Sequence, residues 1–344
     1  MDVRLSPEQV ALRDSVAQVV ARLGPKAVGQ LDDADRRAKL ETAVAAAGWR
    51  ELRAASDDGG PWASAVEVAL VAEELSRGLA DVAFLGPTLA AELRRLAGSE
   101  PATEPETVAL ESSLVSIAIS ADGQPLDGAV AIDAAGAGSA LAVAIDGAEE
   151  RIGQLPVGDD RVEMDLTRPS VRVTGAPKPV PGATLGERDA LGRWLALGLA
   201  ITSAELVGTM RGAVQLAVEY AAQRRQYGVA IGSFQAVQHL LADAHVAAEG
   251  SRAVTLHAAW AVDALPTSEA MAAAALAKAW CARAARTVCE TAIQVHGGIG
   301  NTWECLAHVH LRRALLSSEV LGDAELNLDR VLAHQHLPHR VEAH

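Results

Sequence analysis

Two short segments of the chain carry the residue types best suited to ligand chemistry: residues 224–228 (RRQYG) and residues 294–298 (QVHGG). The guanidinium of Arg224 suits a phosphate group because its donors lie in one plane and its charge is permanent. Gly297 and Gly298 lack a Cβ, so a ligand can approach their backbone closely. Both features also have an ordinary structural explanation, since Arg224 can be a solvated cation at a helix end and Gly297-Gly298 can be a helix C-cap.

Other reactive side chains do not form a recognisable site. The glycines of residues 297–300 (GGIG) follow a predicted helix rather than a strand, so a Rossmann dinucleotide fold is not indicated. His308 and His310, two residues apart, face different sides of a helix. Three cysteines match neither a metal-ligand pattern nor an even disulfide set. They are Cys281, Cys289 and Cys305. We therefore predict no metal site.

Length and composition bound the functional class. A chain of 344 residues is too long for one compact core and indicates two or three lobes. The net charge of −14 disfavours binding to nucleic acid, whose phosphates attract basic surfaces. The sequence shows no long apolar run free of charge, so we expect no membrane span. The N-terminus lacks a basic region followed by an apolar stretch, so we expect a cytoplasmic protein with reduced thiols.

The elements that must position the two segments change in type along the chain. Residues 1–112 read as helices, with a capping box at Ser6 and Gln9. Amphipathic stretches follow near residues 38–48, 64–79 and 86–97. Residues 113–184 contain short Val-, Ile- and Ala-rich segments separated by Gly, Asp and Pro, which is typical of strands and turns. The expected strands cover residues 115–120, 129–133, 140–145, 161–165 and 171–174.

Residues 185–344 read as long helices again. They are expected at residues 187–225, from a cap at Ser233 past residue 255, from Thr267 or Ser268 to His296, and at residues 305–321. Four long Ala- and Leu-rich helices with short connections predict a four-helix bundle. The predicted fold class is therefore mainly α with a small β domain: an N-terminal helical domain, a reduced middle β-domain and a C-terminal bundle.

Four patches of sequence together resemble the acyl-CoA dehydrogenase family over nearly the whole chain. Two of them lie at helix ends and are specific as a pair: residues 224–228 with residues 231–235 (IGSFQ), and residues 294–300 (QVHGGIG). The other two are residues 165–169 (DLTRP), and Gly48-Trp49 with Gly59-Gly60 and residues 71–75 (VAEEL).

The resemblance implies an FAD-dependent enzyme that oxidises the Cα–Cβ bond of an acyl-CoA thioester and passes electrons to an electron-transferring flavoprotein. In this family a carboxylate removes the α-proton, and the β-hydrogen leaves as hydride to the flavin. FAD lies across a subunit interface: the middle domain of one subunit holds the isoalloxazine, and the bundle of its neighbour holds the pyrophosphate and adenine end. By this resemblance Arg224 pairs with the pyrophosphate. The further cofactor-binding residues are Tyr227, Gly228, Gln294, Gly297 and Gly298.

The chain departs from the family at the catalytic base. Most relatives carry a Glu before a Gly, well after the Gly-Gly pair, and here Leu321 stands at that position. A minority carry the Glu directly after the first Arg of the other segment, where this chain has Arg225. Neither side chain accepts a proton at working pH. Three acidic residues nearby could substitute, although each also fits a solvated helix face or a cap. They are Glu304, Glu319 and Asp323.

The middle domain departs from the family as well. It lacks the acidic Thr-Glu-Pro-type and aromatic Trp-Ile-Thr-type segments, and no Trp, Phe or Tyr occurs between Phe84 and Trp194. A flavin ring is normally sandwiched by aromatic or apolar groups. Loss of the base and the flavin cradle resembles the reduced subunit of actinobacterial two-chain acyl-CoA dehydrogenases. Those enzymes pair it with a full-length subunit as an α2β2 heterotetramer with shared FAD, and many act on steroid-derived acyl-CoA.

We therefore predict that this chain carries no catalytic residue and completes the FAD site of a partner. Two alternatives remain open from the sequence. The first is a self-sufficient homo-oligomeric dehydrogenase whose base is displaced to Glu304, Glu319 or Asp323. The second is a non-catalytic scaffold subunit that binds no cofactor.

Overall fold

The N-terminal part of the chain is a layer of four helices. The computed structural model describes residues 4–121, 123–147, 149–162, 165–186 and 189–334. The helices are α1 (Pro7–Leu23), α2 (Ala34–Ala46), α3 (Ala65–Arg77) and α4 (Leu85–Leu96), with a 3-10 turn η1 (Val28–Asp32) after α1. The predicted capping box at Ser6 and Gln9 is confirmed, because each side chain bonds to the backbone N–H of the other residue. This arrangement satisfies N–H groups that the helix itself leaves unpaired.

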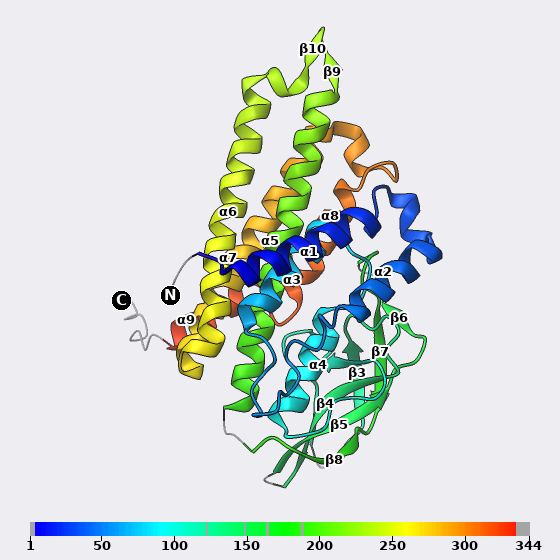
Figure 1. Cartoon of the computed structure of the whole chain (residues 1–344), viewed down its shortest axis with the longest axis vertical. Coiled ribbons are helices and arrows are strands. Elements are labelled where there is room, and N and C mark those ends of the chain that lie inside the picture. The colour runs from blue at the N-terminus through cyan, green and yellow to red at the C-terminus, as the bar shows by residue number, and fades with distance from the viewer. Residues whose placement is uncertain (1–3, 122, 148, 163–164, 187–188, 335–344) are drawn as a thin grey trace, which may run out of the picture.

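An eight-stranded sheet forms the middle of the chain and lies at the lower end of the molecule (Figure 1). Its strand order is β6-β7-β3-β1-β4-β5-β8, with β2 beside β4. The pairs β1–β4 and β2–β4 are parallel, and the other pairs are antiparallel. The strands are β1 (Glu106–Leu110), β2 (Ile119–Ala121), β3 (Leu126–Ala131), β4 (Ser139–Asp146), β5 (Glu149–Pro156), β6 (Arg161–Val162), β7 (Ser170–Gly175) and β8 (Lys178–Thr184).

Three of these strands are missing from the sequence-based expectation: β1, β5 and β8. Strand β1 starts at Glu106, ahead of the boundary expected at residue 113, because the Glu106 carboxylate is buried against Arg94 of α4. Strand β8 contains Pro179 and Pro181, which read as a boundary signal. Proline is tolerated there because β8 pairs only with β5 and forms the edge of the sheet. Residues 163–164, within an expected strand, and residues 187–188, at an expected helix start, lie outside the described residues.

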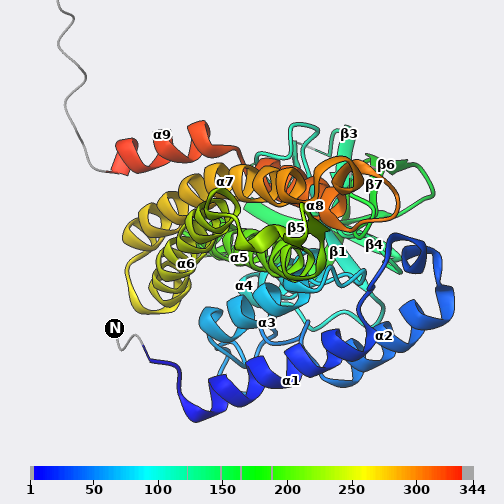
Figure 2. The ribbon, with the colours of Figure 1, turned by 90° about the horizontal axis from the view of Figure 1, so that it is seen from above.

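The C-terminal part is the predicted helical bundle, and the fold class is confirmed. Its helices are α5 (Ala190–Gln223), α6 (Gln235–Ala264), α7 (Thr267–His296), α8 (Ala307–Glu319) and α9 (Ala324–His334). The predicted cap at Ser233 is wrong: Ser233 ends a 3-10 turn η2 (Ile231–Ser233), and its hydroxyl donates to the Ala230 carbonyl. Seen from above, the bundle packs against α3 and α4, with α1 outermost (Figure 2).

The longest helix, α5, runs through the centre of the protein. Among the described helices it is the one that is long and apolar enough to span a membrane by length and composition. Within its most apolar window, however, 78% of the residues are buried inside the fold. An added Cβ at Gly208 would collide with the Glu73 carbonyl of α3, so the close contact of the two helices requires glycine there. These features are typical of a core helix that packs on all sides.

A buried ionic network joins the sheet to the bundle. Arg168, just before β7, donates to both carboxylate oxygens of Glu205 in α5 at 2.7 Å and to the Ser317 hydroxyl of α8. It also pairs with Asp165, and Arg313 of α8 donates to the Thr167 hydroxyl. Burial by itself lowers the pKa of Arg168, but the carboxylates of Glu205 and Asp165 outweigh it, so the pKa is raised. Residues 165–168 therefore hold the domains together rather than line a ligand site.

A buried lysine closes the C-terminal end of α8. Lys278 of α7 is fully buried, and its ammonium donates to three carbonyl oxygens at 2.7–2.8 Å, those of Ser317, Ser318 and Val320. Burial lowers the pKa of Lys278 to about 7, and nearby Glu319 opposes this shift. The three N–H groups of an ammonium match the three carbonyls that a helix end leaves unpaired. This contact fixes the backbone immediately before Leu321.

We expect Lys278→Met to lower the free energy of unfolding by about 2 kcal/mol, because it leaves buried carbonyls unpaired while keeping the volume of the side chain. The measurement is urea denaturation of both proteins at pH 7. Lys39 in α2 is exposed and serves as the matched control, since Lys39→Met should change stability by less than about 0.5 kcal/mol. Equal losses for the two variants would contradict a structural role for Lys278.

Candidate functional site

The position expected for the catalytic base lies in the hydrophobic core. Leu321 is 0% exposed, and its side chain packs against Gly198 of α5 so closely that an added Cβ at Gly198 would collide with it. The side chain of Leu89 from α4 lies on the same spot. The space in which a base would meet a substrate is therefore filled by the chain's own leucines.

Hydrogen bonds hold the backbone of Leu321 on both sides, at its N–H and at its carbonyl. The N–H of Leu321 donates to the Leu114 carbonyl at 2.7 Å, and both leucines have left-handed φ values, 62° and 60°. Arg330 of α9 donates to the Leu321 carbonyl at 2.6 Å and to the Val115 carbonyl at 3.3 Å. Leucine adopts such a backbone only where its surroundings enforce it. The loop that follows β1 is thus held against the turn between α8 and α9.

The three acidic residues considered as displaced bases lie on the surface. Glu304, Glu319 and Asp323 are all exposed. Asp323 accepts the N–H of Leu326 at 2.8 Å and so caps α9. A helix N-terminus attracts anions such as phosphate, but here a carboxylate of the chain already fills that position. The ordinary explanation, a cap or a solvated face, therefore fits Asp323.

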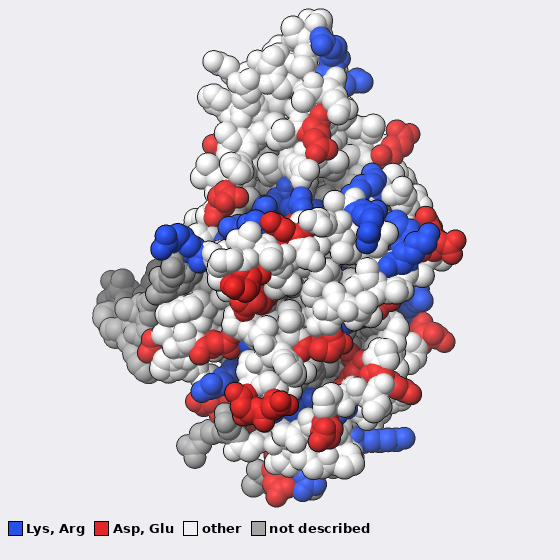
Figure 3. Space-filling model, in the orientation of Figure 1, with Lys and Arg blue, Asp and Glu red and all other residues white. Residues whose placement is uncertain are grey.

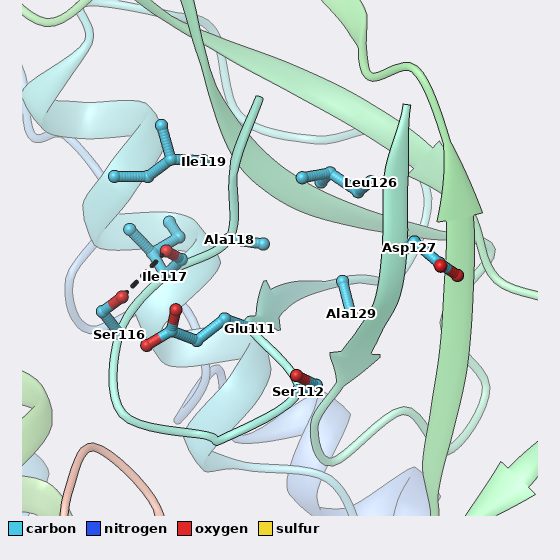
Figure 4. Close-up of a pocket in the computed structure, with 9 residues that line it drawn as sticks. All are labelled: Glu111, Ser112, Ser116, Ile117, Ala118, Ile119, Leu126, Asp127 and Ala129. Atoms are coloured by element: carbon cyan, nitrogen blue, oxygen red, sulfur yellow. Dashed lines mark hydrogen bonds between the residues drawn. The ribbon is translucent and has the colours of Figure 1, made fainter. Parts of the chain in front are cut away.

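Two hollows on the described surface can be compared with the size of a ligand pocket. One, of about 190 Å³, lies between the loop that carries Glu111 and Ile117 and the strand that carries Leu126 and Ala129 (Figure 4). Its volume falls below the roughly 300 Å³ at which ligand pockets begin. A larger groove of about 540 Å³ lies between α6, α7 and α9. Neither hollow is lined by Leu321 or by the three candidate acids.

Residues 224–228 form a projecting hairpin at the end of α5. Arg224 is the C-cap of α5, and its guanidinium is exposed with no ion pair among the described residues. Strands β9 (Arg225–Gln226) and β10 (Val229–Ala230) pair across a turn made by Tyr227 and Gly228. Both turn residues have positive φ, 53° and 83°, as a two-residue hairpin of this type requires. Tyr227 is 93% exposed, and its ring faces the Phe234 ring at 80° with centroids 6.4 Å apart.

Residues 294–298 form the open C-terminal end of α7. Gln294 lies exposed in the last turn, and Gly297 is the C-cap with φ 66° and ψ −145°, a conformation open mainly to glycine. The C-cap explanation for the glycine pair is thus confirmed for Gly297. An added Cβ at Gly297 or Gly298 would meet nothing within 4 Å. The backbone here is therefore accessible to a ligand as well as structurally required.

An aromatic contact brings the two segments to one end of the bundle. The ring of Tyr220, one helical turn before Arg224, stacks on the ring of His296 with centroids 4.5 Å apart. His296 directly precedes Gly297, and its Nδ1 lies 2.7 Å from the Ala292 carbonyl. Figure 1 shows the end of α7 beside the upper part of α5, below the hairpin. Sequence reasoning left His296 without a role and missed Tyr220, although its spacing from Arg224 puts both on one helix face.

The surface around the hairpin combines a basic tip with exposed apolar side chains. Figure 3 shows basic side chains at the tip of the projecting end and few charges on the rest of it. Large apolar side chains are exposed on this end of the bundle, and such patches mark interaction sites. They are Val218, Val229, Leu240 and Val246.

The residues present fit one half of FAD and not the other. An unpaired guanidinium at Arg224, the Gln294 carboxamide and the open backbone of Gly297 and Gly298 suit a pyrophosphate. The residues expected for the isoalloxazine half are not found, because Leu321 is buried in the core and no aromatic residue lies between Phe84 and Trp194. The residues suited to the pyrophosphate are therefore exposed, whereas the expected base position is buried.

Comparison with known protein families identifies both helical parts. The family model for the acyl-CoA dehydrogenase N-terminal domain matches residues 6–101, and the model for the acyl-CoA dehydrogenase C-terminal domain matches residues 188–336. Among individual proteins, the acyl-CoA dehydrogenase IpdE2 of Mycolicibacterium smegmatis is 31% identical over 339 residues. That match covers 96% of this chain and 99% of the relative.

Solved structures with the same fold include two-chain complexes. The ChsE4–ChsE5 complex from Mycobacterium tuberculosis matches with a TM-score of 0.77 and 24% identity, covering 98% of this chain and 100% of that one. A variant of the steroid ACAD Tcur3481–Tcur3483 matches with a TM-score of 0.78 and 21% identity, covering 95% and 97%. At these identities the likeness concerns the fold.

Proposed function

Because this chain belongs to the acyl-CoA dehydrogenase family of oxidoreductases acting on CH–CH bonds, we propose that it completes the FAD site of a partner chain that carries the catalytic base. Members of the family typically bind FAD. In this proposal the chain supplies the pyrophosphate and adenine end of the site and contributes no proton acceptor. The flavin cradle and the base belong to a full-length acyl-CoA dehydrogenase chain.

The observation that carries the proposal is the burial of Leu321. Removal of an α-proton needs a positioned group with a suitable pKa, and that position holds a fully buried hydrocarbon. At the same time Arg224 and the backbone of Gly297 and Gly298 remain open to solvent. The buried base position and the exposed phosphate end therefore support a chain that serves one half of the site.

The residues of this chain act by binding and orienting. FAD, when bound, would supply a hydride acceptor for the β-hydrogen of the acyl group. Arg224 would hold its pyrophosphate through paired N–H donors. Gln294 supplies a further donor and acceptor, and the bare backbone at Gly297 and Gly298 allows the phosphates to come close. Tyr227 and Gly228 set the direction of the hairpin that presents Arg224 to the partner.

The partner and substrate class are inferred from the neighbouring proteins. Two solved neighbours are a variant of the steroid ACAD Tcur3481–Tcur3483 and the ChsE4–ChsE5 complex. We infer that this chain likewise assembles with a second acyl-CoA dehydrogenase chain, as an α2β2 heterotetramer. A steroid-derived acyl-CoA is the proposed substrate, and an electron-transferring flavoprotein is the proposed electron acceptor. The acidic chain is expected to work in the cytoplasm.

The test is a flavin absorbance spectrum of the chain purified alone, beside the chain co-expressed with a full-length acyl-CoA dehydrogenase gene. We expect a colourless lone chain and a yellow complex in which both chains elute in one gel-filtration peak. The physical reason is that an exposed pyrophosphate site alone gives weak binding, while both halves together enclose the cofactor.

The opposite result has a clear meaning. Stoichiometric FAD on the lone chain, with reduction of that FAD by an acyl-CoA, would overturn the half-site proposal in favour of the self-sufficient enzyme. Glu304, Glu319 and Asp323 would then be the next residues to replace.

A further inference from the structure

Aromatic side chains are unevenly distributed in this protein. Both tyrosines, one of the two phenylalanines and one of the six tryptophans lie at the cofactor end of the bundle, while the sheet domain has none. These residues are Tyr220, Tyr227, Phe234 and Trp303. Tyr220 is occupied by its stack on His296, and Phe234 lies in edge contact with Tyr227. Trp303 remains as a large aromatic surface that the proposed pyrophosphate site does not use.

Trp303 is exposed and follows a hydrogen-bonded turn. Its side chain is 64% exposed, which is unusual for so large an apolar group. The preceding residue is fixed, because the amide and the hydroxyl of Thr302 both donate to the Ile299 carbonyl, at 3.0 and 2.8 Å. Ile299 belongs to the 3-10 turn η3 (Gly297–Asn301), which starts at the glycine pair. The loop that carries Trp303 is thus an extension of the open end of α7.

The indole is in contact with an aromatic ring of α8. The ring of His308 in α8 meets it nearly at right angles, at 80°, with centroids 5.1 Å apart. Burial lowers the pKa of His308, and the charge of Arg312 adds to this, so the supporting imidazole is neutral near pH 7. An edge contact of this kind steadies an indole and leaves most of its surface free for a second ring.

We propose that Trp303 stacks on the adenine of the dinucleotide whose pyrophosphate lies at Arg224 and Gly297-Gly298. This inference rests on the proposed function and extends it to the base-binding part of the same site. Every nucleobase has a flat π-face, and stacking on an aromatic side chain contributes usefully to binding without hydrogen-bond readout. A fixed, solvent-exposed indole five residues beyond Gly298 meets this requirement. A partner protein is the competing occupant of this surface, since tryptophan is also common at the centre of protein interfaces.

The test uses the full-length chain and two probes, ADP and inorganic pyrophosphate, with binding followed by titration and by tryptophan fluorescence. Trp303→Leu should weaken ADP about tenfold, a typical effect of losing one stacked base, and should leave pyrophosphate unchanged. ADP should quench emission in the wild type more than in this variant. Trp303→Phe should restore part of the ADP affinity. Trp62, which is 65% exposed in the N-terminal part, gives the matched control Trp62→Leu, for which neither probe should change.

The other outcomes distinguish failure of adenine stacking at Trp303 from failure of the proposed function. If Trp303→Leu binds ADP as the wild type does, while Arg224→Gln weakens both probes, adenine stacking is wrong and the proposed function stands. If Trp303→Leu leaves ADP unchanged and instead disrupts co-elution with the partner chain, Trp303 packs on protein and the inference is again wrong. If the wild type binds neither probe up to millimolar concentration at low salt, both the pyrophosphate site and the stacking inference fail.

Discussion

Replacing Leu321 with glutamate will destabilise the chain by about 4 kcal/mol and will not create an enzyme that works alone. The side chain lies fully buried against Gly198 and Leu89, where a carboxylate finds no donor. The two cations nearby are already engaged: Lys278 with three carbonyls of the α8 end, and Arg330 with the Leu321 carbonyl. Glutamate must therefore enter the core protonated or force the turn between α8 and α9 to open.

The measurement is the free energy of unfolding from urea denaturation, together with flavin content and acyl-CoA oxidation by the lone variant. Leu321→Met is the matched control, because it keeps the volume and should cost less than about 1.5 kcal/mol. A Leu321→Glu protein of wild-type stability that acquires FAD and oxidises an acyl-CoA would contradict the closed-cleft interpretation. It would mean that a single residue, rather than a filled cleft, separates this chain from an ordinary dehydrogenase.

Much of the fold follows from the sequence because local signals determine helix ends. The capping box at Ser6 and Gln9 satisfies backbone N–H groups at the start of α1, and Gly297 ends α7 directly after His296. The start of α7 at Thr267 also agrees with the prediction, although no side chain caps it. Ser233 failed as a cap because its hydroxyl bonds back to Ala230 within η2. That choice depends on the path of the preceding hairpin, which local composition does not encode.

The strands and the closed cleft depend on contacts between distant residues. Glu106 becomes part of β1 because Arg94 of α4 pairs with it in the interior. Strand β8, with two prolines, is stable only because it has a single neighbour in the sheet. Likewise, the sequence predicts the loss of the base at Leu321. The hydrogen bonds that Leu114 and Arg330 make to Leu321 form only where two loops meet. Such long-range pairings are visible only once the tertiary structure is known.

Selective accessibility is the feature that links the fold to the proposed function. The position expected for the catalytic base is buried at Leu321, whereas α5 and α7 end side by side in exposed segments. The stack of Tyr220 on His296 joins these two ends, so the groups proposed to bind phosphate are already held near each other. Preorganisation of this kind favours binding because little freedom is lost when the cofactor and the partner assemble.

Arg224→Gln in the co-purified complex should lower the affinity for FAD about thirtyfold, since hydrogen bonds from a charged group are worth roughly 1.5–3 kcal/mol and every 1.4 kcal/mol is tenfold. Glutamine keeps some hydrogen-bonding capacity but removes the charge and the planar pair of donors. Stability of the folded chain should not change, because the side chain is exposed and makes no ion pair among the described residues. Flavin retention after dialysis and titration of the flavin-free complex measure the effect.

Arg225→Gln separates a specific contact from a loss of positive charge. Arg225 is equally exposed and lies next to Arg224, but it is the first residue of β9, where successive side chains point to opposite faces. If Arg224 contacts the pyrophosphate directly, Arg225→Gln should change FAD affinity less than about threefold, an effect limited to screened long-range attraction. Equal losses would indicate a general electrostatic effect of the hairpin. Full flavin content in the Arg224→Gln complex would instead favour a scaffold subunit, because the residue best suited to the phosphates would then have no part in holding them.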